Sequence, residues 1–484
     1  MLSVKDIWCR WFRRFILGLV LAVDFGSTYT KVAAFDFTNE TLVGVAKSAT
    51  TVETDIMIGL DKALEKLRET VNLEEQGIEH IFSSSSAAGG LRMVVAGFTN
   101  ELTTKAAKEA ALGSGAKVVG TYPNGISSVD CTAIEQIAPD LILLTGGTDG
   151  GNKQLLLQNA AVLAESRLDV PFIIAGNKMA SGEALTLLSN SGKFAVVAEN
   201  VLPELDVLNI EPTRSAIREV FMQRITLAKG LEKAQEIVSA PIMPTPFAVL
   251  KGAALLAAGA EGEEGLGDVM VVDVGGATTD VVSIAQGRPC VTNTIVKGIA
   301  EPYEKRTVEG DLGIRYNAVS IVEIAGAEMV VDKMRLISEE APEPSTLLTM
   351  AEHLSGHVDY IPQNDTDYLF DAGLAGAAVD FATRRHAGTI EEAYFPSGTV
   401  RIQRGKDLTE VTSIIGTGGI FAYNDRQRHI LKSACFDQNF PESLRPAAPE
   451  CFVDESYILY ALGLLAGYSP LKALRIIKKH LKKV

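Results

Sequence analysis

Short apolar runs alternate with amphipathic stretches over the first half of the chain. The apolar positions of residues 54–71 recur at helical spacing, which predicts a helix. Its apolar face consists of Ile56, Leu60, Leu64 and Leu67. Apolar runs separated by helical stretches then predict a parallel, doubly wound sheet. These runs lie at 81–82, 93–96, 117–119, 141–144, 172–175 and 194–197. We interpret residues 79–208 as an α/β insertion, because a minimal first lobe does not require them.

Two other segments, 21–33 and 271–282, share a different pattern. In each, an apolar strand leads to an Asp, a turn that contains glycine, a hydroxyl residue and a second apolar strand. The Asp is Asp24 in the first segment and Asp273 in the second. One such hairpin could be an ordinary turn, whereas two in one chain suggest two lobes that close on one nucleotide.

These hairpins suit nucleotide phosphates. Glycine tolerates positive φ and has no Cβ, so backbone N–H groups can converge on an anion. Asp24 and Asp273 cannot bind phosphate, but their carboxylates can hold Mg²⁺ through water and orient an attacking water, and Asp273 could also assist as a base. We expect phosphate contacts from Gly26, Ser27, Thr28, Lys31, Gly275, Gly276, Ala277 and Thr278. The side chain of Lys31 could equally point to solvent.

A third motif lies nearer the C-terminus, at residues 412–420. It reads as an apolar strand that ends in a glycine-rich turn, where bare backbone could approach an adenosine. The expected adenosine contacts are Gly416, Thr417, Gly418 and Gly419. Two stretches rich in small residues, 244–254 and 457–466, predict helices that cross closely, as a hinge between lobes requires.

Composition narrows the class of protein. The chain has 484 residues, enough for at least two domains, and 47% of them are hydrophobic, so a large core is expected. A formal net charge of −15 argues against broad nucleic-acid binding, which needs a basic face. The five cysteines are dispersed without CxxC spacing, which indicates reduced thiols in a cytoplasmic protein.

The N-terminus imitates a signal peptide, since basic residues precede an apolar run at 15–23. That run is shorter than the roughly 20 residues that span a bilayer. It also leads straight into Asp24 without a small-residue cleavage site. We therefore predict a leader at 1–17, a first lobe at 18–265 and a second lobe at 266–484, whose C-terminal helices pack back toward the first lobe.

Several other segments admit two interpretations. The glycine-rich stretch 145–152 is either a ligand loop or a tight strand-to-helix turn in which Asp149 or Asn152 caps a helix. The stretch 83–90 favours a polar loop or a close helix contact. Arg315 either reaches a nucleotide oxygen or forms a structural ion pair. Residues 259–267 favour a solvated loop.

The order of the three motifs and two helices resembles the actin, Hsp70 and sugar-kinase superfamily of ATPases. This resemblance implies a two-lobed α/β fold, actin-like and ribonuclease H-like, with the α/β insertion in the first lobe. Within the superfamily, residues 21–36, 87–93, 143–152 and 273–280 resemble the MutL/GlmL family. Its members accompany adenosylcobalamin-dependent glutamate mutase and related aminomutases, and they are distinct from the mismatch-repair protein of the same name.

The family resemblance implies an ATP-binding and ATP-hydrolysing chaperone, with ATP and Mg²⁺ as cofactors and mutase subunits as partners. Such a chaperone would release damaged cobalamin from its client by switching its lobes, and it could form homo-oligomers. Two alternatives use the same fold. A metabolite kinase would consume ATP only with its substrate, and an actin-like scaffold would assemble in a nucleotide-dependent way.

Overall fold

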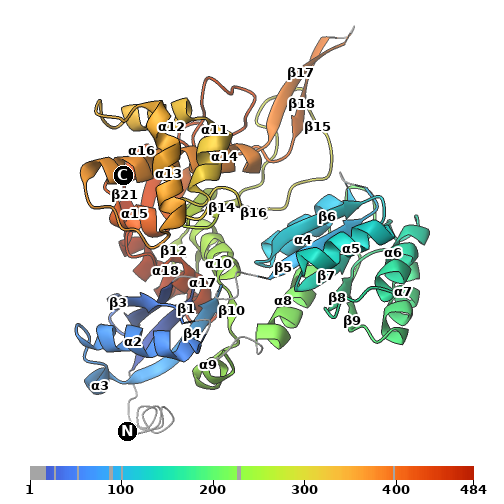
Figure 1. Ribbon diagram of the computed structural model, residues 1–484, viewed down its shortest axis with the longest axis horizontal. Helices are drawn as coiled ribbons and strands as arrows, with labels where there is room; N and C mark the ends of the chain where they lie inside the picture. The colour runs from blue at the N-terminus through green and yellow to red at the C-terminus, as the bar shows by residue number, and fades with distance from the viewer. Residues whose placement is uncertain are drawn as a thin grey trace. The chain divides into compact units, whose positions relative to one another are not determined.

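The computed structural model describes residues 18–26, 29–51, 54–86, 91–99, 102–225, 231–395 and 398–484 (Figure 1). The predicted leader 1–17 lies outside these residues. The chain forms two compact units. The first contains the described residues up to Gly252, with Gly298–Ala300 and Tyr460–Ile476. The second contains Ala253–Lys297, Glu301–Leu459 and Ile477–Val484.

The first unit is built on a five-stranded sheet of order β10-β4-β1-β2-β3. Its strands are β1 (Leu19–Phe25), β2 (Tyr29–Asp36), β3 (Thr41–Ala49), β4 (Ile78–Ser85) and β10 (Met243–Pro244). The first three strands pair antiparallel, while β4 and β10 run parallel to β1. The associated helices are α2 (Ile56–Arg68), α3 (Leu73–Gln76), α9 (Leu231–Ile237), α10 (Thr245–Ala258), α17 (Leu459–Leu465) and α18 (Pro470–Lys479).

Helix α2 confirms the helix predicted from periodicity. All four residues of the predicted apolar face are buried. The helix begins at Ile56, because the side chain of Asp55 accepts the N–H of Met57 and caps it. The predicted close helix crossing is also present. A Cβ added to Gly463 of α17 would lie 1.7 Å from the carbonyl oxygen of Ala248 in α10, so only glycine permits this crossing.

The first unit also contains a second, wholly parallel sheet of order β6-β5-β7-β8-β9. Its strands are β5 (Arg92–Gly97), β6 (Lys117–Pro123), β7 (Leu141–Leu144), β8 (Phe172–Ile174) and β9 (Ala195–Val197). The helices are α4 (Thr103–Gly113), α5 (Ser128–Ile137), α6 (Gln154–Ala164), α7 (Lys178–Asn190) and α8 (Glu211–Ile225). Apolar side chains on opposite faces of its strands belong to separate core clusters, one with α4 and α8 and the other with α5, α6 and α7. The predicted doubly wound sheet is therefore confirmed.

One strand of that predicted series pairs elsewhere. Residues 81–82 belong to β4, which lies beside β1 and not beside β5. An apolar run predicts a buried strand but not its neighbours, because partner choice depends on register and on contacts distant in sequence.

The second unit repeats the architecture of the first sheet. Its six-stranded sheet has the order β16-β14-β13-β19-β20-β21. The strands are β13 (Val269–Val274), β14 (Thr279–Ile284), β16 (Glu304–Glu309), β19 (Ser413–Thr417), β20 (Glu450–Asp454) and β21 (Leu481–Lys483). Strands β13, β14 and β16 pair antiparallel, and β19 and β20 run parallel to β13. Two units with the same ribonuclease H-like strand order confirm the predicted fold class.

The remaining elements of the second unit cover this sheet or extend from it. The helices are α11 (Ala318–Ala325), α12 (Ala327–Arg335), η1 (Pro344–Thr346), α13 (Leu347–Gly356), α14 (Asp365–His386), α15 (Gly419–Tyr423) and α16 (Gln427–Lys432). A three-stranded sheet contains β15 (Thr294–Val296), β18 (Gly398–Arg404) and β17 (Thr389–Phe395). The stretch predicted as a solvated loop contains a short hairpin, β11 (Gly259–Ala260) and β12 (Glu263–Glu264). Among the described residues, no helix combines the length and the apolar character needed to cross a membrane.

Candidate functional site

The first predicted hairpin is formed by β1 and β2. Asp24 lies on β1 directly opposite Lys31 of β2. The Lys31 ammonium approaches Asp24 Oδ2 at 3.2 Å, and both side chains are largely shielded from water. Lys31 therefore does not point to solvent, which corrects one of the two expectations for it. Its charge compensates that of Asp24, which a buried carboxylate requires.

Two hydroxyl groups from distant segments complete the surroundings of Asp24. Ser84 Oγ donates to Asp24 Oδ1 at 3.0 Å, and Thr245 Oγ1 donates to the same oxygen at 2.5 Å. Ser84 lies on β4, so the first serines of the stretch predicted as a polar loop are the end of a buried strand. The parallel pairing of β4 with β1 places Ser84 opposite Asp24. Residues 87–90 lie outside the described residues.

The turn of the first hairpin requires its glycine. The N–H of Gly26 donates to the carbonyl of Tyr29 at 3.1 Å. A Cβ on Gly26 would lie 2.5 Å from that carbonyl oxygen, so a larger residue would open the turn. Ser27 and Thr28, the predicted phosphate contacts between them, lie outside the described residues.

The second hairpin, β13 and β14, has the same register. Asp273 lies opposite Asp280, as Asp24 lies opposite Lys31. The N–H of Gly275 donates to the carbonyl of Thr278 at 2.9 Å, matching the Gly26–Tyr29 bond of the first turn.

The charge of Asp280 is compensated from the adjacent strand. Arg306 on β16 donates from Nε at 3.0 Å and from Nη2 at 2.5 Å to Asp280 Oδ1. The Oδ2 atom of Asp280 accepts the hydroxyl of Thr278 at 3.1 Å. The acid opposite Asp273 is thus neutralised by a buried arginine and fixes a hydroxyl of the turn.

The turn 275–278 has its carbonyls occupied and its N–H groups available. The carbonyl of Gly275 accepts the N–H of Ile314 at 3.1 Å, and that of Gly276 accepts two N–H groups at 2.9 Å. The Ala277 carbonyl accepts the side-chain amide of Asn317 at 2.7 Å. In the described part of the chain, no acceptor faces the N–H groups of Gly276, Ala277 and Thr278. A turn that offers only donors is suited to an anion.

The segment after β16 packs against this turn. A Cβ on Gly313 would lie 2.2 Å from the carbonyl carbon of Ala277, so the two backbones touch. Arg315 donates to both carboxylate oxygens of Asp371 on α14, at 2.8 and 2.6 Å. Of the two interpretations of Arg315, the structural ion pair is the one that the geometry supports. Burial raises the pKa of Asp371, although the Arg315 guanidinium counteracts this effect.

The third motif lies beside the second hairpin. Strand β19 runs parallel to β13 and pairs Thr417 with Asp273. Gly418 follows with φ +105° and ψ 167°, a conformation that is essentially restricted to glycine. A Cβ there would lie 2.5 Å from the Val274 carbonyl oxygen and 2.8 Å from Asp273 Oδ1. The predicted phosphate and adenosine motifs of this unit therefore meet at Asp273 and Gly418.

The four residues of the third motif have different surroundings. Gly416 packs under the ring of Phe421, and the hydroxyl of Thr417 donates to the buried Asp454 at 3.0 Å. Gly419 has open space where a Cβ would be. Asp454 also accepts the N–H groups of Ile458 and Leu459, and its burial raises its pKa. No sequence signal marked Asp454, because its role appears only when β20 lies beside β19.

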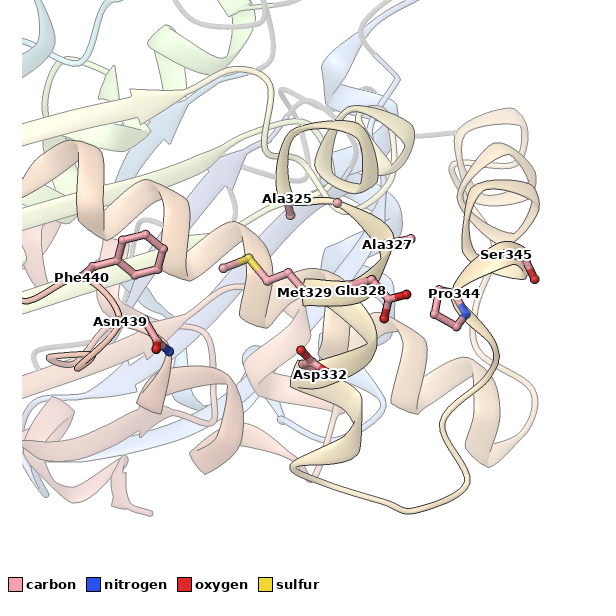
Figure 2. Close-up of a pocket in the computed structure, with 10 residues that line it drawn as sticks. Ala325, Ala327, Glu328, Met329, Asp332, Pro344, Ser345, Asn439 and Phe440 are labelled. Carbon is pink, nitrogen blue, oxygen red and sulfur yellow. The ribbon is translucent and has the colours of Figure 1, made fainter.

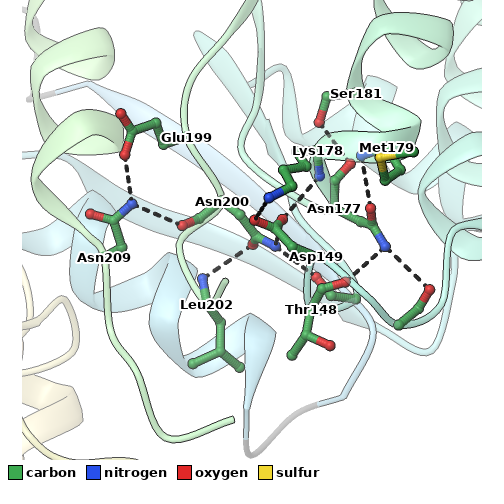
Figure 3. Close-up of polar contacts among 12 residues, drawn as sticks. Thr148, Asp149, Asn177, Lys178, Met179, Ser181, Glu199, Asn200, Leu202 and Asn209 are labelled. Carbon is green, nitrogen blue, oxygen red and sulfur yellow. Dashed lines mark hydrogen bonds and ion pairs between the residues drawn. The ribbon is translucent and has the colours of Figure 1, made fainter. Parts of the chain in front are cut away.

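The glycine-rich stretch 145–152 follows β7 in the insertion (Figure 3). Asp149 Oδ1 accepts the N–H of Lys178 at 3.1 Å, and Asn152 Oδ1 accepts the N–H of Leu155 at 3.1 Å. Both residues therefore satisfy backbone groups at helix starts, as the turn interpretation predicted. The buried Asn177 donates to the carbonyl of Thr148 at 2.7 Å and so ties this turn to the one after β8.

A pocket of about 640 Å³ lies elsewhere in the second unit (Figure 2). It is bounded by the start of α12, by η1 and by Asn439 and Phe440. None of the predicted site residues that the structure describes lines it.

The repeated sheet, each copy carrying an Asp–Gly hairpin at the same place, defines the actin-like, ribonuclease H-like class of folds. The sequence matches the family described as MutL protein over residues 20–481. The chain therefore belongs to the MutL family. It is 44% identical to Protein MutL of Clostridium tetanomorphum over 464 residues, which are 96% of this chain and 99% of that protein.

Solved structures show more distant similarity. An acetone carboxylase in its nucleotide-free form is 14% identical, with 93% of this chain and 70% of that chain covered and a TM-score of 0.38. A gluconate kinase from Lactobacillus acidophilus is 11% identical, with 97% and 93% covered and a TM-score of 0.34. At these scores the likeness has no bearing on function.

Proposed function

We propose that this chain is a Mg²⁺-dependent ATPase that reactivates an adenosylcobalamin-dependent mutase, such as glutamate mutase or a related aminomutase. The observation that carries the nucleotide part is the turn 275–278, which presents three backbone donors and no available carbonyl beside Asp273. Membership of the MutL family, together with the resemblance of the motifs, supports the choice of client.

Each hairpin by itself offers groups of the kind that bind Mg-ATP. The N–H groups of Gly276, Ala277 and Thr278 would bind phosphate oxygens, as would those of Ser27 and Thr28 in the first turn, which Gly26 closes. Asp24 and Asp273 offer carboxylate oxygens, the ligand type that Mg²⁺ prefers, and would hold it through water. When bound, Mg²⁺ neutralises phosphate charge.

The roles of the other predicted residues follow from their surroundings. Lys31 holds Asp24 in place and lies within reach to add positive charge near a phosphate. Gly418 and Gly419 would border the adenosine, since neither has a side chain and a Cβ on Gly419 would meet open space. Gly416 and Thr417 would support that loop from inside, through Phe421 and Asp454.

The catalytic contribution of the chain would be positioning and charge stabilisation, as in phosphoryl transfer generally. Asp273 would orient the attacking water and could accept its proton. Loss of the terminal phosphate would remove the acceptor from the donor turn and so release the closed state of the chaperone, which would free the damaged cobalamin.

Reactivation of a cobalamin-inactivated glutamate mutase, with fresh adenosylcobalamin present, tests this function. We expect recovery with Mg-ATP, none without it, and none with the Asp273→Ala variant. Normal recovery by Asp273→Ala would contradict the nucleotide site. ATP hydrolysis without recovery of mutase activity would contradict the client, and hydrolysis only with an added metabolite would point to a kinase.

A further inference from the structure

Exposed apolar side chains gather at one edge of the insertion's parallel sheet. In a parallel sheet, the carboxyl ends of all strands and the following helix starts lie along the same edge. Six exposed large apolar residues occupy this edge or the loops that follow it: Phe98, Val129, Met179, Val197, Leu205 and Val207. At the opposite edge, in the same described part of the insertion, only Phe194 is comparably exposed. Leu205 and Met179 are 67% and 62% exposed.

A polar network holds this edge in one conformation (Figure 3). Asp149 accepts the side-chain amide of Asn200 at 2.9 Å and the backbone N–H of Lys178 at 3.1 Å. The N–H of Asp149 donates to the carbonyl of Pro203 at 2.9 Å. Asn200 also donates to the Gly147 carbonyl and accepts the N–H of Leu202. The loops after β7, β8 and β9 are therefore joined to one another, and their outer side chains are pre-organised.

A tight turn at residues 204–207 lies in the loop after β9. The N–H of Val207 donates to the carbonyl of Glu204 at 3.3 Å, and Asp206 between them has φ +63°. All four residues of the turn are exposed. Because Pro203 and Asn209 are hydrogen-bonded to the network, the turn presents Leu205 and Val207 on a fixed base.

The charge of this loop selects among partners. Glu199, Glu204 and Asp206 are exposed, and residues 199–210 contain no Lys or Arg. Lys178, beside Met179, is exposed but pairs with Asp149 at 3.5 Å, so acidic charge predominates here. A second copy of the chain would bring the same acids and an overall charge of −15, so self-association here is opposed by repulsion. A partner that surrounds an apolar patch with basic residues is complementary to this edge.

We propose that the edge formed by Met179 and the turn 204–207 is the docking surface for the client mutase, and that it binds a patch of the client with apolar residues surrounded by Lys and Arg. This inference rests on the proposed function, since it takes the client from there. It assigns the α/β insertion to client recognition and separates that role from the nucleotide hairpins.

Binding of purified glutamate mutase, inactivated with hydroxocobalamin, tests the surface. Leu205→Ala/Val207→Ala should weaken binding by about 10-fold or more, because the two truncations remove apolar area that binding would bury. Glu204→Gln/Asp206→Asn keeps the turn, because Asn tolerates positive φ, and it should reduce both the affinity and its dependence on salt. Phe194→Ala, at the opposite edge, is the matched control and should bind as the wild type does. All three variants should hydrolyse ATP normally.

The outcomes separate the two proposals. Wild-type affinity of Leu205→Ala/Val207→Ala for the mutase would overturn the docking surface and leave the ATPase and client assignments standing. An equal loss in Phe194→Ala would also overturn it. If the wild-type chain hydrolyses ATP but binds no mutase, the client assignment fails, and the docking inference fails with it.

Discussion

The two hairpins have the same backbone register but surround their aspartates differently. In the first, Asp24 faces Lys31 and accepts the hydroxyl groups of Ser84 and Thr245, so its charge is matched locally. In the second, Asp273 faces another acid, Asp280, whose charge is matched by Arg306 on the next strand. The backbone pattern is repeated while the electrostatic environment is not.

This difference distinguishes an aspartate whose pairing stabilises the fold from one whose surroundings are not explained by folding alone. When a protein buries a carboxylate beside its own cation, removing either partner lowers the stability of the folded protein. Two acids that face each other across a hairpin repel, so a third group has to compensate this repulsion. In the second hairpin, Arg306 on the neighbouring strand offsets the charge of Asp280. Among the described residues, no acceptor meets the N–H groups of residues 276–278 in the adjacent turn, which is therefore suited to an anion.

The largest expected effect comes from neutralising each aspartate in turn. Asp24→Asn removes the buried carboxylate that pairs with Lys31 and should cost about 3 kcal/mol of the free energy of unfolding. Asp273→Asn leaves the Asp280–Arg306 pair intact and should therefore cost less of the free energy of unfolding than Asp24→Asn does. Both should lose Mg²⁺-dependent ATP hydrolysis. Calorimetry together with a phosphate-release assay distinguishes the two, and equal destabilisation would contradict the comparison.

A smaller effect is expected from the glycines beside Asp273. Gly418→Ala forces a Cβ into a conformation that costs about 1–3 kcal/mol and against the carbonyl of Val274. It should lower the thermal midpoint by roughly 5 °C and weaken ATP binding. Gly419→Ala is the matched control, because a Cβ there meets open space. Similar midpoints for both variants would contradict the close contact of the third motif with the second hairpin.

The smallest effect concerns the sheet behind the second hairpin. His386 is fully buried between Ser283 of β14 and Thr307 of β16, at 2.8 and 2.9 Å. Burial and the nearby lysines hold its pKa well below its ordinary value. The unfolded chain therefore binds a proton below pH about 6.5 that the folded chain does not, and stability falls there by at most about 1.4 kcal/mol per pH unit.

The substitution His386→Gln removes that titration. Urea unfolding between pH 5 and 8 should show a shallower acid decline for the variant, although its stability at neutral pH is lower. An unchanged acid slope would show that other groups cause the acid sensitivity of this unit.

Residues close together in the sequence were sufficient to predict helix α2 and the two hairpins. The periodicity of 54–71 predicted α2, and Asp55 then set its first residue. The repeated Asp–Gly pattern predicted two hairpins, because alternating apolar residues around a glycine turn specify one locally. Glycine identity likewise anticipated positions such as Gly463 and Gly418, where a Cβ has no room.

The sequence by itself therefore determined helix α2, the strands of the insertion and the two Asp–Gly hairpins, since each depends on residues close together in the chain. The order of the motifs along the chain indicated the fold class. Only the tertiary structure decided the sheet of β4, the hydroxyl groups of Ser84 and Thr245 on Asp24, and the acid beneath Thr417. These contacts join residues up to 221 positions apart. Partner choice over such distances depends on strand order and register, which arise from the sum of many weak packing contacts rather than from any local pattern.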